Sequence, residues 1–549
     1  MKKWTWKRAA ALGLVLILML AMAACGSSDA DSGSAADSET SADAQTASDD
    51  VLNIGVSIDF TTIDTIVGYS TEMNMIVNAV TEGLFYFDEN SEVQPLLVDT
   101  WEQTDQTTYV YQIRQDVAFS DGTQLTAEDV VFSLERHLDE DNASQLAWMF
   151  ENVDTIEQTG DYEVTVTLTQ ADPTWQYTLA TPAGNVISKA YYEEHAEDFG
   201  TAEGGIVGSG AYTITEWATE EITLEYNEDY WDAANTSVGY TTVQFTSVTD
   251  ESVLKTALAS GQIDIAWGVS LEAAAELEET DGVNIQLVDA LSCYFVSFNT
   301  TVEGLDDARV RQAIAYAIDK DSILSDLIGE KYGEVGESQL FSDKITGANA
   351  DLWGDYFETD ETYSYDPQKA TELLEEAGYG DGLELTLKYD ASDSLYENLS
   401  LYIQANLADV GITLTIEGVD SAEIMTLRYG GSETRDYELL ITGWGSDYPD
   451  PLGTILPMYY SANNAAGGSN WAEYNSSEFD ALITAQAQAE TEEERVEILQ
   501  AALDLIAEDL PYAPIYIRYE NWAVSEEVEY TFTTMELYNI FIKDIQKAQ

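Results

Sequence analysis

The sequence predicts an α/β protein of two or three lobes, and three observations support this fold class. The chain has 549 residues, which is more than one compact core usually holds. Hydrophobic residues make up 45% of it, which excludes a largely disordered protein. Segments typical of strands alternate with segments typical of helices, most clearly in the later half, and this alternation is typical of α/β lobes.

The predicted strands are short runs in which apolar residues cluster or alternate with polar ones. A buried strand is expected where the run is apolar throughout, and a half-buried one where the alternation is strict. These runs are Val51–Val56, Tyr109–Ile113, Glu163–Leu168, 383–387 and Ile412–Ile416. A further strand–helix–strand unit is expected over 242–267, with Asp250 capping its helix.

The predicted helices begin and end at recognisable cap residues. Thr126 opens a helix in the manner of a capping box, with Asp129 in place of the usual Glu or Gln. Asp366 precedes a helix that has Pro367 at its first position and ends at Gly378. Proline at the start and glycine after the end are the usual punctuation of a helix, so these boundaries follow from local chemistry.

Charge and composition exclude several classes of function. The formal net charge is -81, and nucleic acid binding needs clustered Lys and Arg, so we expect no nucleic acid partner. Such a charge favours a soluble monomer. The chain has two cysteines, Cys25 and Cys293, and two histidines, His137 and His195, so we expect no metal site and no cofactor. Cys293 is expected as a buried thiol, and His137, in a charged helix, as a solvated side chain.

The first fifty residues carry targeting information. Residues 1–24 combine a basic start with an apolar stretch too short for the roughly 20 residues that span a bilayer, which predicts a signal peptide. Small residues before Cys25 resemble a bacterial lipoprotein cleavage box, which implies cleavage there and a lipid on the Cys25 sulfur. Residues 25–50 then form a flexible acidic tether. We expect an extracytoplasmic protein, lipid-anchored to the outer face of the membrane; a plain secretory signal is the alternative.

A series of short motifs follows in order along the rest of the chain. They are Glu82-Gly83-Leu84, Pro95-Leu96-Leu97, Val117 to Gly122, Leu125 to Val130, Gly208 to Tyr212, Tyr230-Trp231, Phe298-Asn299, Asp307 to Ala313 and Trp444 to Pro451. Together they resemble the oligopeptide- and dipeptide-binding proteins of ABC importers, the extracellular solute-binding proteins of family 5. The resemblance covers nearly the whole chain after Val51.

This resemblance implies a two-lobed, periplasmic-binding-protein-like clamp of type II, built from three domains. Domain I would comprise 51–87, 205–289 and 512–549, domain II 88–204, and domain III 290–511. The chain would cross between the lobes near residue 290 and again near 511. A hinge crossed twice is suited to closure around a ligand.

The resemblance also implies how a ligand would be held. Peptide binders of the family hold an extended peptide through main-chain hydrogen bonds, which are independent of peptide sequence. Asp447 occupies the position that meets the peptide α-ammonium, after Trp444, and Gly443 and Gly445 would let a ligand strand approach the backbone closely. The other interpretation of Asp447 is a loop-capping carboxylate before Pro449.

Two further parts of the site follow from the same resemblance. Gly68, Tyr69 and Ser70 align with the ligand-facing loop of the smaller sheet lobe. A carboxylate-binding arginine is also expected, and the sequence does not choose between Arg428 and Arg435.

The expected function is therefore capture of short peptides and their delivery to the transmembrane subunits of an ABC permease. A hydrolase is disfavoured because no Gly-x-Ser-x-Gly or His-Glu-x-x-His motif occurs and two histidines leave little for general-base chemistry. Within the family, an oligosaccharide, metal-chelate or opine binder and a peptide-pheromone receptor stay open as alternatives.

Overall fold

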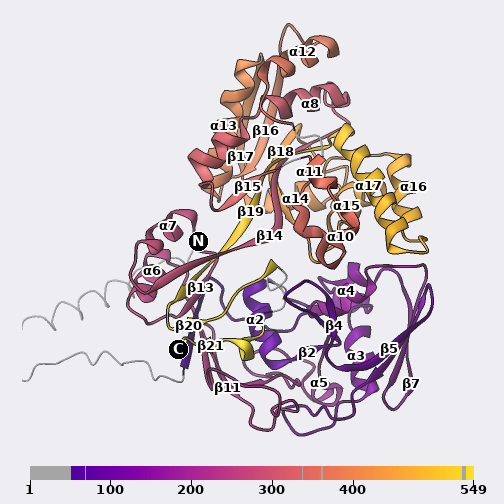
Figure 1. Cartoon of the computed structure of the whole chain (residues 1–549), viewed down its shortest axis with the longest axis vertical. Coiled ribbons are helices and arrows are strands. Elements are labelled where there is room, and N and C mark those ends of the chain that lie inside the picture. Colours follow the sequence, from indigo (N-terminus) through magenta and orange to yellow (C-terminus); the bar gives the residue numbers. More distant parts are fainter. Residues whose placement is uncertain (1–50, 69, 337, 360–362, 535–539) are drawn as a thin grey trace, which may run out of the picture. The chain divides into compact units, whose positions relative to one another are not determined.

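The computed structural model describes residues 51–549 except 69, 337, 360–362 and 535–539 (Figure 1). The predicted signal peptide, Cys25, the tether and Tyr69 lie outside the described residues. The described chain is built of mixed sheets flanked by helices, which confirms the α/β class. Within these ranges no helix is long and apolar enough to cross a membrane.

The largest sheet has eleven strands and runs through both halves of the described chain. The strands are β1 (Val51–Val56), β10 (Tyr212–Ala218), β11 (Glu221–Tyr226), β12 (Thr242–Ser247), β13 (Ile265–Trp267), β14 (Val283–Phe298), β15 (Gly333–Val335), β16 (Leu383–Asp390), β17 (Ile412–Val419), β18 (Leu439–Gly445) and β19 (Tyr512–Ser525). Their order is β10-β11-β12-β1-β13-β19-β14-β18-β16-β17, with β15 paired to β19. Parallel pairs join β1 to β12 and β13 at one end, and β16 to β17 and β18 at the other.

Around β1, the sheet is accompanied by α2 (Thr71–Val80), α6 (Glu251–Ala259) and α7 (Leu271–Glu278). The predicted strand–helix–strand unit is confirmed as β12, α6 and β13. Asp250 caps α6, because its carboxylate accepts from the backbone N–H groups of Ser252 and Val253. The apolar residues of β1, including Leu52 and Ile54, are almost fully buried in one core.

The helices of the other half precede, separate or follow β16, β17 and β18 in the chain (Figure 1). Asp366 caps α12 through the N–H of Lys369, and Gly378 ends it with a φ of 94°, as the sequence predicted. The helices are α8 (Ala308–Ala317), α9 (Lys320–Ile323), α10 (Ala350–Trp353), α11 (Tyr356–Thr359), α12 (Pro367–Ala377), α13 (Ser394–Asp409), α14 (Ser421–Tyr429), α15 (Leu452–Tyr459), α16 (Ser477–Gln486) and α17 (Glu492–Asp509), with a π-helical turn at Leu324–Ile328.

A second sheet is antiparallel and contains four strands in the order β5-β6-β8-β7, with β5 (Val98–Asp105), β6 (Thr108–Ile113), β7 (Val153–Gly160) and β8 (Glu163–Leu168). Its helices are α3 (Ala127–Glu135), α4 (Trp175–Ala180) and α5 (Lys189–His195). The predicted capping box at α3 is confirmed, because Thr126 donates to the Asp129 carboxylate from its N–H and its hydroxyl, at 3.0 and 2.9 Å.

Small elements complete the described structure. The two-stranded pairs are β2 (Glu82–Gly83) with β9 (Asn185–Val186), β3 (Phe85–Phe87) with β4 (Val93–Pro95), and β20 (Val528–Glu529) with β21 (Gln546–Lys547). Turns of 3-10 helix lie at Glu140–Asn142, Ala147–Phe150, Pro182–Gly184, Asp343–Asn349, Ser461–Asn464 and Ile542–Asp544.

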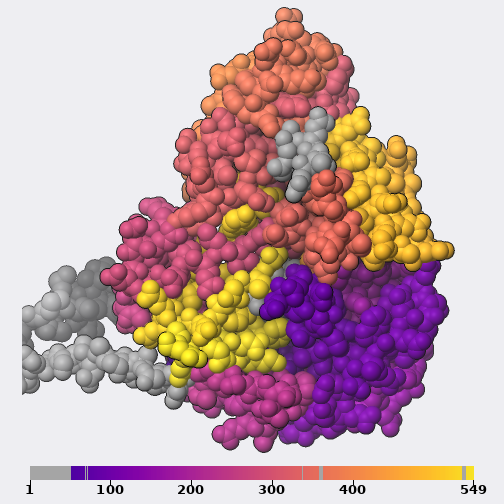
Figure 2. Space-filling view, in the orientation of Figure 1, coloured from indigo at the N-terminus to yellow at the C-terminus, as the bar shows by residue number. Residues whose placement is uncertain are grey.

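Two long strands join the halves of the large sheet. β14 and β19 pair antiparallel from Val283 opposite Ser525 to Ser297 opposite Tyr512. One end of β19 also pairs with β13, and the other end of β14 pairs with β18, so both strands cross from one half to the other. Figure 2 shows yellow C-terminal residues on both the upper and the lower part of this face. This is the two-lobed arrangement that the sequence predicted, while the residue boundaries of the three domains stay a prediction.

The pairing of β14 with β19 is irregular at two points, one of which is a register shift between Tyr294 and Phe295. The pairing of β14 with β19 shifts register between Asp289 and Ser292, and Leu291 there has a φ of 49°. A non-glycine residue in the left-handed region is uncommon and marks local strain. The bulge lies where the sequence predicted the first lobe crossing, near residue 290.

The expectation that His137 is solvated is wrong. Its side chain is buried, its ring stacks on Phe150 with centroids 4.8 Å apart, and its Nδ1 lies 2.8 Å from the Ser144 hydroxyl. Burial, together with the neighbouring charge of Arg136, lowers the pKa of His137 to about 3. The charged residues next to His137 in the sequence did not indicate its burial, because neighbouring residues of a helix point in different directions. The prediction for Cys293 is confirmed: its thiol is free and buried, and burial raises its pKa to about 12.

The His137 pKa predicts a specific pH dependence of stability. Below pH 6.5 the unfolded chain protonates His137, whereas the folded chain keeps it neutral down to about pH 3, so its contribution to stability falls as the pH falls. Between pH 7 and pH 5 the parent protein should lose about 2 kcal/mol relative to a His137→Phe variant. Urea unfolding of both proteins at the two pH values measures this difference.

The half-exposed His195 provides the matched control, and His195→Phe should follow the parent curve. Parallel curves for the parent and His137→Phe would show that His137 does not cause the acid sensitivity.

Candidate functional site

The strand that carries the predicted glycines has one open edge. β18 pairs with β14 along the whole length of β18, from Leu439 to Gly445. On the other side, β16 pairs with β18 only at Leu439 and Leu440. Among the described strands, none pairs with the second edge of residues 441–445. An unpaired edge of this kind can accept an extended chain through its backbone N–H and C=O groups.

The two glycines of this segment differ in what the fold asks of them. A Cβ atom at Gly443 would lie 3.3 Å from the Cys293 carbonyl oxygen, which is tighter than an ordinary contact. A Cβ atom at Gly445 would lie 3.6 Å from the Ser292 Cβ, an ordinary contact distance. Packing therefore favours glycine at 443 but does not require it at 445. Because Gly445 has no side chain, another backbone can approach the strand closely at this position.

A set of six residues shares the face of the sheet on which these glycines lie, and we call it the glycine face. Directly opposite residues of antiparallel strands point to the same side. The row Gly443, Tyr294 and Tyr516 crosses β18, β14 and β19, and the row Gly445, Ser292 and Arg518 lies beside it. The two tyrosine rings stack with centroids 4.8 Å apart, which confirms the shared face.

The glycine face carries a charge that the sequence analysis missed. Arg518 forms an ion pair of 2.8 Å with Glu520, and Tyr294 lies close enough to influence its pKa. Burial raises the pKa of Glu520, Arg518 opposes that shift, and the charge of Glu72 adds to it. The strand period could have indicated that Tyr516, Arg518 and Glu520 share one face of β19, because they are spaced two residues apart.

Trp444 lies on the opposite face from the two glycines. It is paired with Cys293, its indole meets Trp471 edge to face at 5.7 Å, and its N–H donates to the Gly453 carbonyl at 3.3 Å. The Trp444 side chain therefore does not share a face with Gly443 and Gly445, and its contacts stabilise β18 from the opposite face of the sheet.

Asp447 follows directly after the open strand, in a half-buried position. The turn around it is held by its neighbours: the Ser446 hydroxyl donates to the Tyr448 carbonyl at 2.8 Å, and Asp450 forms a buried ion pair of 2.8 Å with Arg495. Asp450 also accepts from the N–H of Leu452 at the start of α15. These contacts fix the turn in which Asp447 lies, and both interpretations of Asp447, ligand binding and loop capping, stay predictions.

The predicted loop of the other lobe is ordered by local contacts. The N–H of Gly68 donates to the Asp64 carbonyl at 3.0 Å, and the Ser70 hydroxyl caps α2 by accepting from the N–H of Met73 at 3.3 Å. Glu72, in the first turn of α2, lies close enough to Glu520 to influence its pKa. The start of α2 therefore lies near the hinge strand β19.

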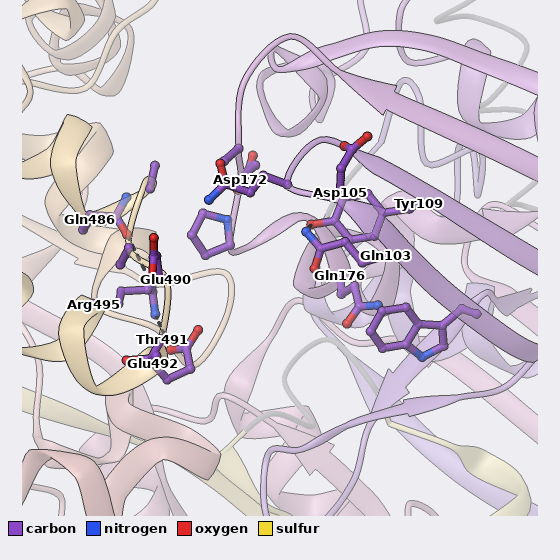
Figure 3. Close-up of a pocket in the computed structure, with 16 residues that line it drawn as sticks. Gln103, Asp105, Tyr109, Asp172, Gln176, Gln486, Glu490, Thr491, Glu492 and Arg495 are labelled. Atoms are coloured by element: carbon purple, nitrogen blue, oxygen red, sulfur yellow. Dashed lines mark hydrogen bonds and ion pairs between the residues drawn. The ribbon is translucent and has the colours of Figure 1, made fainter.

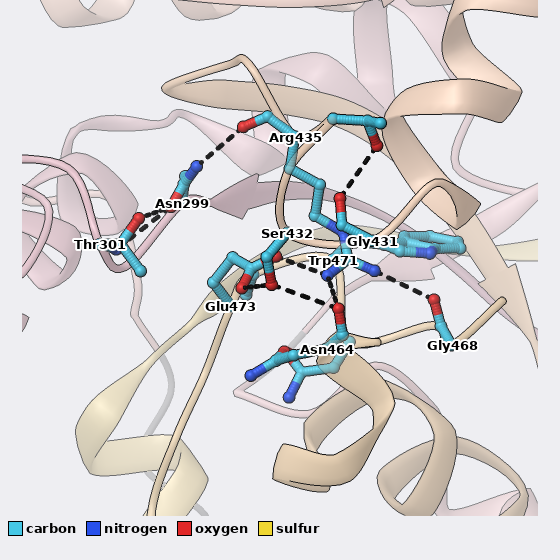
Figure 4. Close-up of polar contacts among 12 residues, drawn as sticks. Asn299, Thr301, Gly431, Ser432, Arg435, Asn464, Gly468, Trp471 and Glu473 are labelled. Carbon is cyan, nitrogen blue, oxygen red and sulfur yellow. Dashed lines mark hydrogen bonds and ion pairs between the residues drawn. The ribbon is translucent and has the colours of Figure 1, made fainter. Parts of the chain in front are cut away.

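The structure gives the two arginine candidates different roles, and Figure 4 shows the contacts of Arg435. The Arg435 side chain is fully enclosed: it pairs with Glu473 at 2.5 Å and donates to the backbone carbonyls of Asn464, Gly468 and Arg428. It is a structural arginine with no free side for a ligand. Arg428 is partly buried, with its guanidinium 4.0 Å from the centre of the Trp471 ring, and it remains a candidate.

A separate cavity of about 660 Å³ lies between the four-stranded sheet and the helices α16 and α17 (Figure 3). Residues of β5, β6 and α4 form one wall, and Gln486, Glu490, Thr491, Glu492 and Arg495 form the other. Some polar groups of the walls are already paired: Arg495 donates to Asp450 and Gln486, and Gln103 donates to the Tyr109 hydroxyl. None of the predicted site residues lines this cavity.

These features define a two-lobed binding protein with an open strand edge beside its hinge. The chain belongs to the bacterial extracellular solute-binding proteins, family 5, whose family model (described as its Middle part) matches residues 92–466. Family 5 proteins are solute-binding proteins of ABC importers, so the family predicted from the sequence is confirmed.

Individual relatives differ in their ligands. The glutathione-binding protein GsiB of Salmonella paratyphi A is 25% identical over 474 residues, which cover 86% of this chain and 89% of GsiB. The structure of DppA from Helicobacter pylori in complex with the peptide STSA has a TM-score of 0.74 and 23% identity, covering 91% of this chain and 98% of DppA. That of AgaA from A. tumefaciens R10 with agropinic acid has a TM-score of 0.72 and 25% identity, covering 91% and 99%.

Proposed function

We propose that this protein captures short peptides outside the cytoplasm and delivers them to the permease of an ABC importer, without catalysing a reaction. The observation that carries the proposal is the open edge of residues 441–445, with bare backbone at Gly443 and Gly445 and a carboxylate following at Asp447. Backbone hydrogen bonds to such an edge hold a peptide without depending on its side chains.

The relatives support a peptide but do not require one. GsiB is named for glutathione, a tripeptide, and DppA was solved with a peptide, whereas AgaA was solved with an opine. The same fold therefore accepts chemically different ligands. An unpaired strand edge favours a peptide, because only a ligand with repeated amide groups can use several of its donors and acceptors at once.

Asp447 is the group we assign to the peptide α-ammonium. Closure of the lobes would remove water from the bound ligand, and a desolvated ammonium without a charged partner costs several kcal/mol. Asp447 lies half-buried in the turn that Ser446 and Asp450 hold, two residues beyond the open strand, where it can meet the first residue of a peptide on that edge.

Replacing Asp447 by Ala should weaken the binding of free peptides by ~30- to 5,000-fold, or ~2–5 kcal/mol, because it would leave the α-ammonium unpaired. N-acetylated peptides lack that ammonium, should bind the parent poorly, and should lose little more in the variant. Isothermal titration calorimetry of both peptides against both proteins measures the coupling.

Asp436→Ala removes an exposed carboxylate from the same lobe and should leave both affinities unchanged. Equal losses for free and acetylated peptides in Asp447→Ala would assign Asp447 to the loop. Tight binding of acetylated peptides by the parent would instead favour a non-peptide ligand.

We also propose that the mature protein is a monomer anchored to the outer face of the membrane by a lipid on Cys25. The support is the basic and apolar leader, the small residues before Cys25 and the acidic tether that follows. The net charge of -81 favours the monomer through self-repulsion.

Cys25→Ser should release the protein into the medium or leave it unprocessed, since serine cannot carry the thioether lipid. Membrane fractionation and intact-mass measurement distinguish these states. Cys293→Ala, which alters the buried cysteine, should stay anchored and acylated. A Cys25→Ser protein that remains acylated and membrane-bound would refute the anchor.

A further inference from the structure

Arg518 differs from the other arginines that this chain keeps inside its fold. The Arg435 side chain is 0% exposed and Arg495 is 5% exposed, and carboxylates or carbonyls accept from both terminal nitrogens of each. Arg518 lies in the middle of a sheet, yet its side chain is 34% exposed. An arginine that served only to neutralise a buried carboxylate would have no need of an open side.

Arg518 stands in one row of the glycine face with two of its smallest residues. Its neighbour on β14 is Ser292, and the next position, on β18, is Gly445. Two strand spacings of about 4.8 Å separate β19 from β18, so the path between them is about 10 Å of nearly bare backbone. Neither of these residues has a long side chain that could reach over the guanidinium.

The guanidinium also keeps donors for a further partner. It carries five N–H groups; its Nη2 donates to the Glu520 carboxylate at 2.8 Å, and Tyr294 lies nearby. These contacts fix its orientation at the hinge. A carboxylate is the group that such a planar, oriented fork binds best, through two parallel hydrogen bonds.

We propose that Arg518 binds an anionic group of the captured peptide, either its free C-terminal carboxylate or an acidic side chain. The inference rests on the proposed peptide function and narrows it to short peptides that carry a carboxylate near the hinge. A chain with 102 acidic and 21 basic residues offers few places where an anion is favoured, so a single exposed arginine beside the binding edge has a large effect on ligand choice.

Four tripeptides separate the two sources of the carboxylate: Ala-Ala-Ala, its C-terminal amide, Ala-Glu-Ala amide and Ala-Gln-Ala amide. Calorimetry on the full-length parent should show about 10- to 100-fold tighter binding for the acid over the amide, or for Glu over Gln. The ratio identifies which carboxylate Arg518 meets.

In the double variant Arg518→Gln/Glu520→Gln this preference should fall to about onefold, while the peptides that lack the preferred carboxylate keep their parent affinity. The double change removes both members of the ion pair, so neither is left without the other, and urea unfolding checks that the variant is folded. Arg518→Lys is a second test that keeps the charge, and it should retain part of the preference. Arg309→Gln, which removes an exposed arginine elsewhere, should retain all of it.

The outcomes separate this inference from the proposed function. If the parent binds all four peptides equally, Arg518 binds no anion and the inference is overturned, while peptide capture stands. If the double variant or Arg518→Lys keeps the full preference, another cation is responsible and the inference is again overturned. If none of the four peptides binds the parent, peptide capture itself is wrong, and the inference falls with it.

Discussion

The pairing of β14 with β19 is the interaction on which the rest of the structure depends. It joins the parallel strands around β1 to those around β16 in one continuous sheet, and both chain crossings between the lobes lie within it. One of its two register shifts, the bulge at Leu291, lies at the crossing itself. A long paired ladder with a local bulge can bend at one place without unfolding, which is what a clamp requires.

The same pairing builds the candidate site. It places Tyr294 beside Tyr516 and Ser292 beside Arg518, and β18 adds the two glycines to these rows. The hinge and the glycine face are therefore made of the same strands, so a ligand held there contacts the point about which the lobes would move. Ligand binding can then shift the balance between open and closed forms through its different affinity for each.

Local signals in the sequence predicted the elements, and tertiary contacts decided the rest. The capping box at Thr126, the start at Asp366 and the family motifs depend on neighbours in the chain, and these predictions hold. His137 and Arg518 depend on residues far away in the sequence. Nothing near His137 indicates that Phe150 will cover it, and nothing near Arg518 shows that Gly445 will lie two strands away.

We propose that the backbone of a captured peptide pairs with the open edge of residues 441–445. Amide hydrogen exchange, measured with and without a saturating tripeptide, tests this pairing. The peptide should slow exchange within residues 441–445, and the same peptide methylated on its backbone nitrogens should not. Tight peptide binding with unchanged exchange across this segment would contradict the pairing and place the ligand elsewhere.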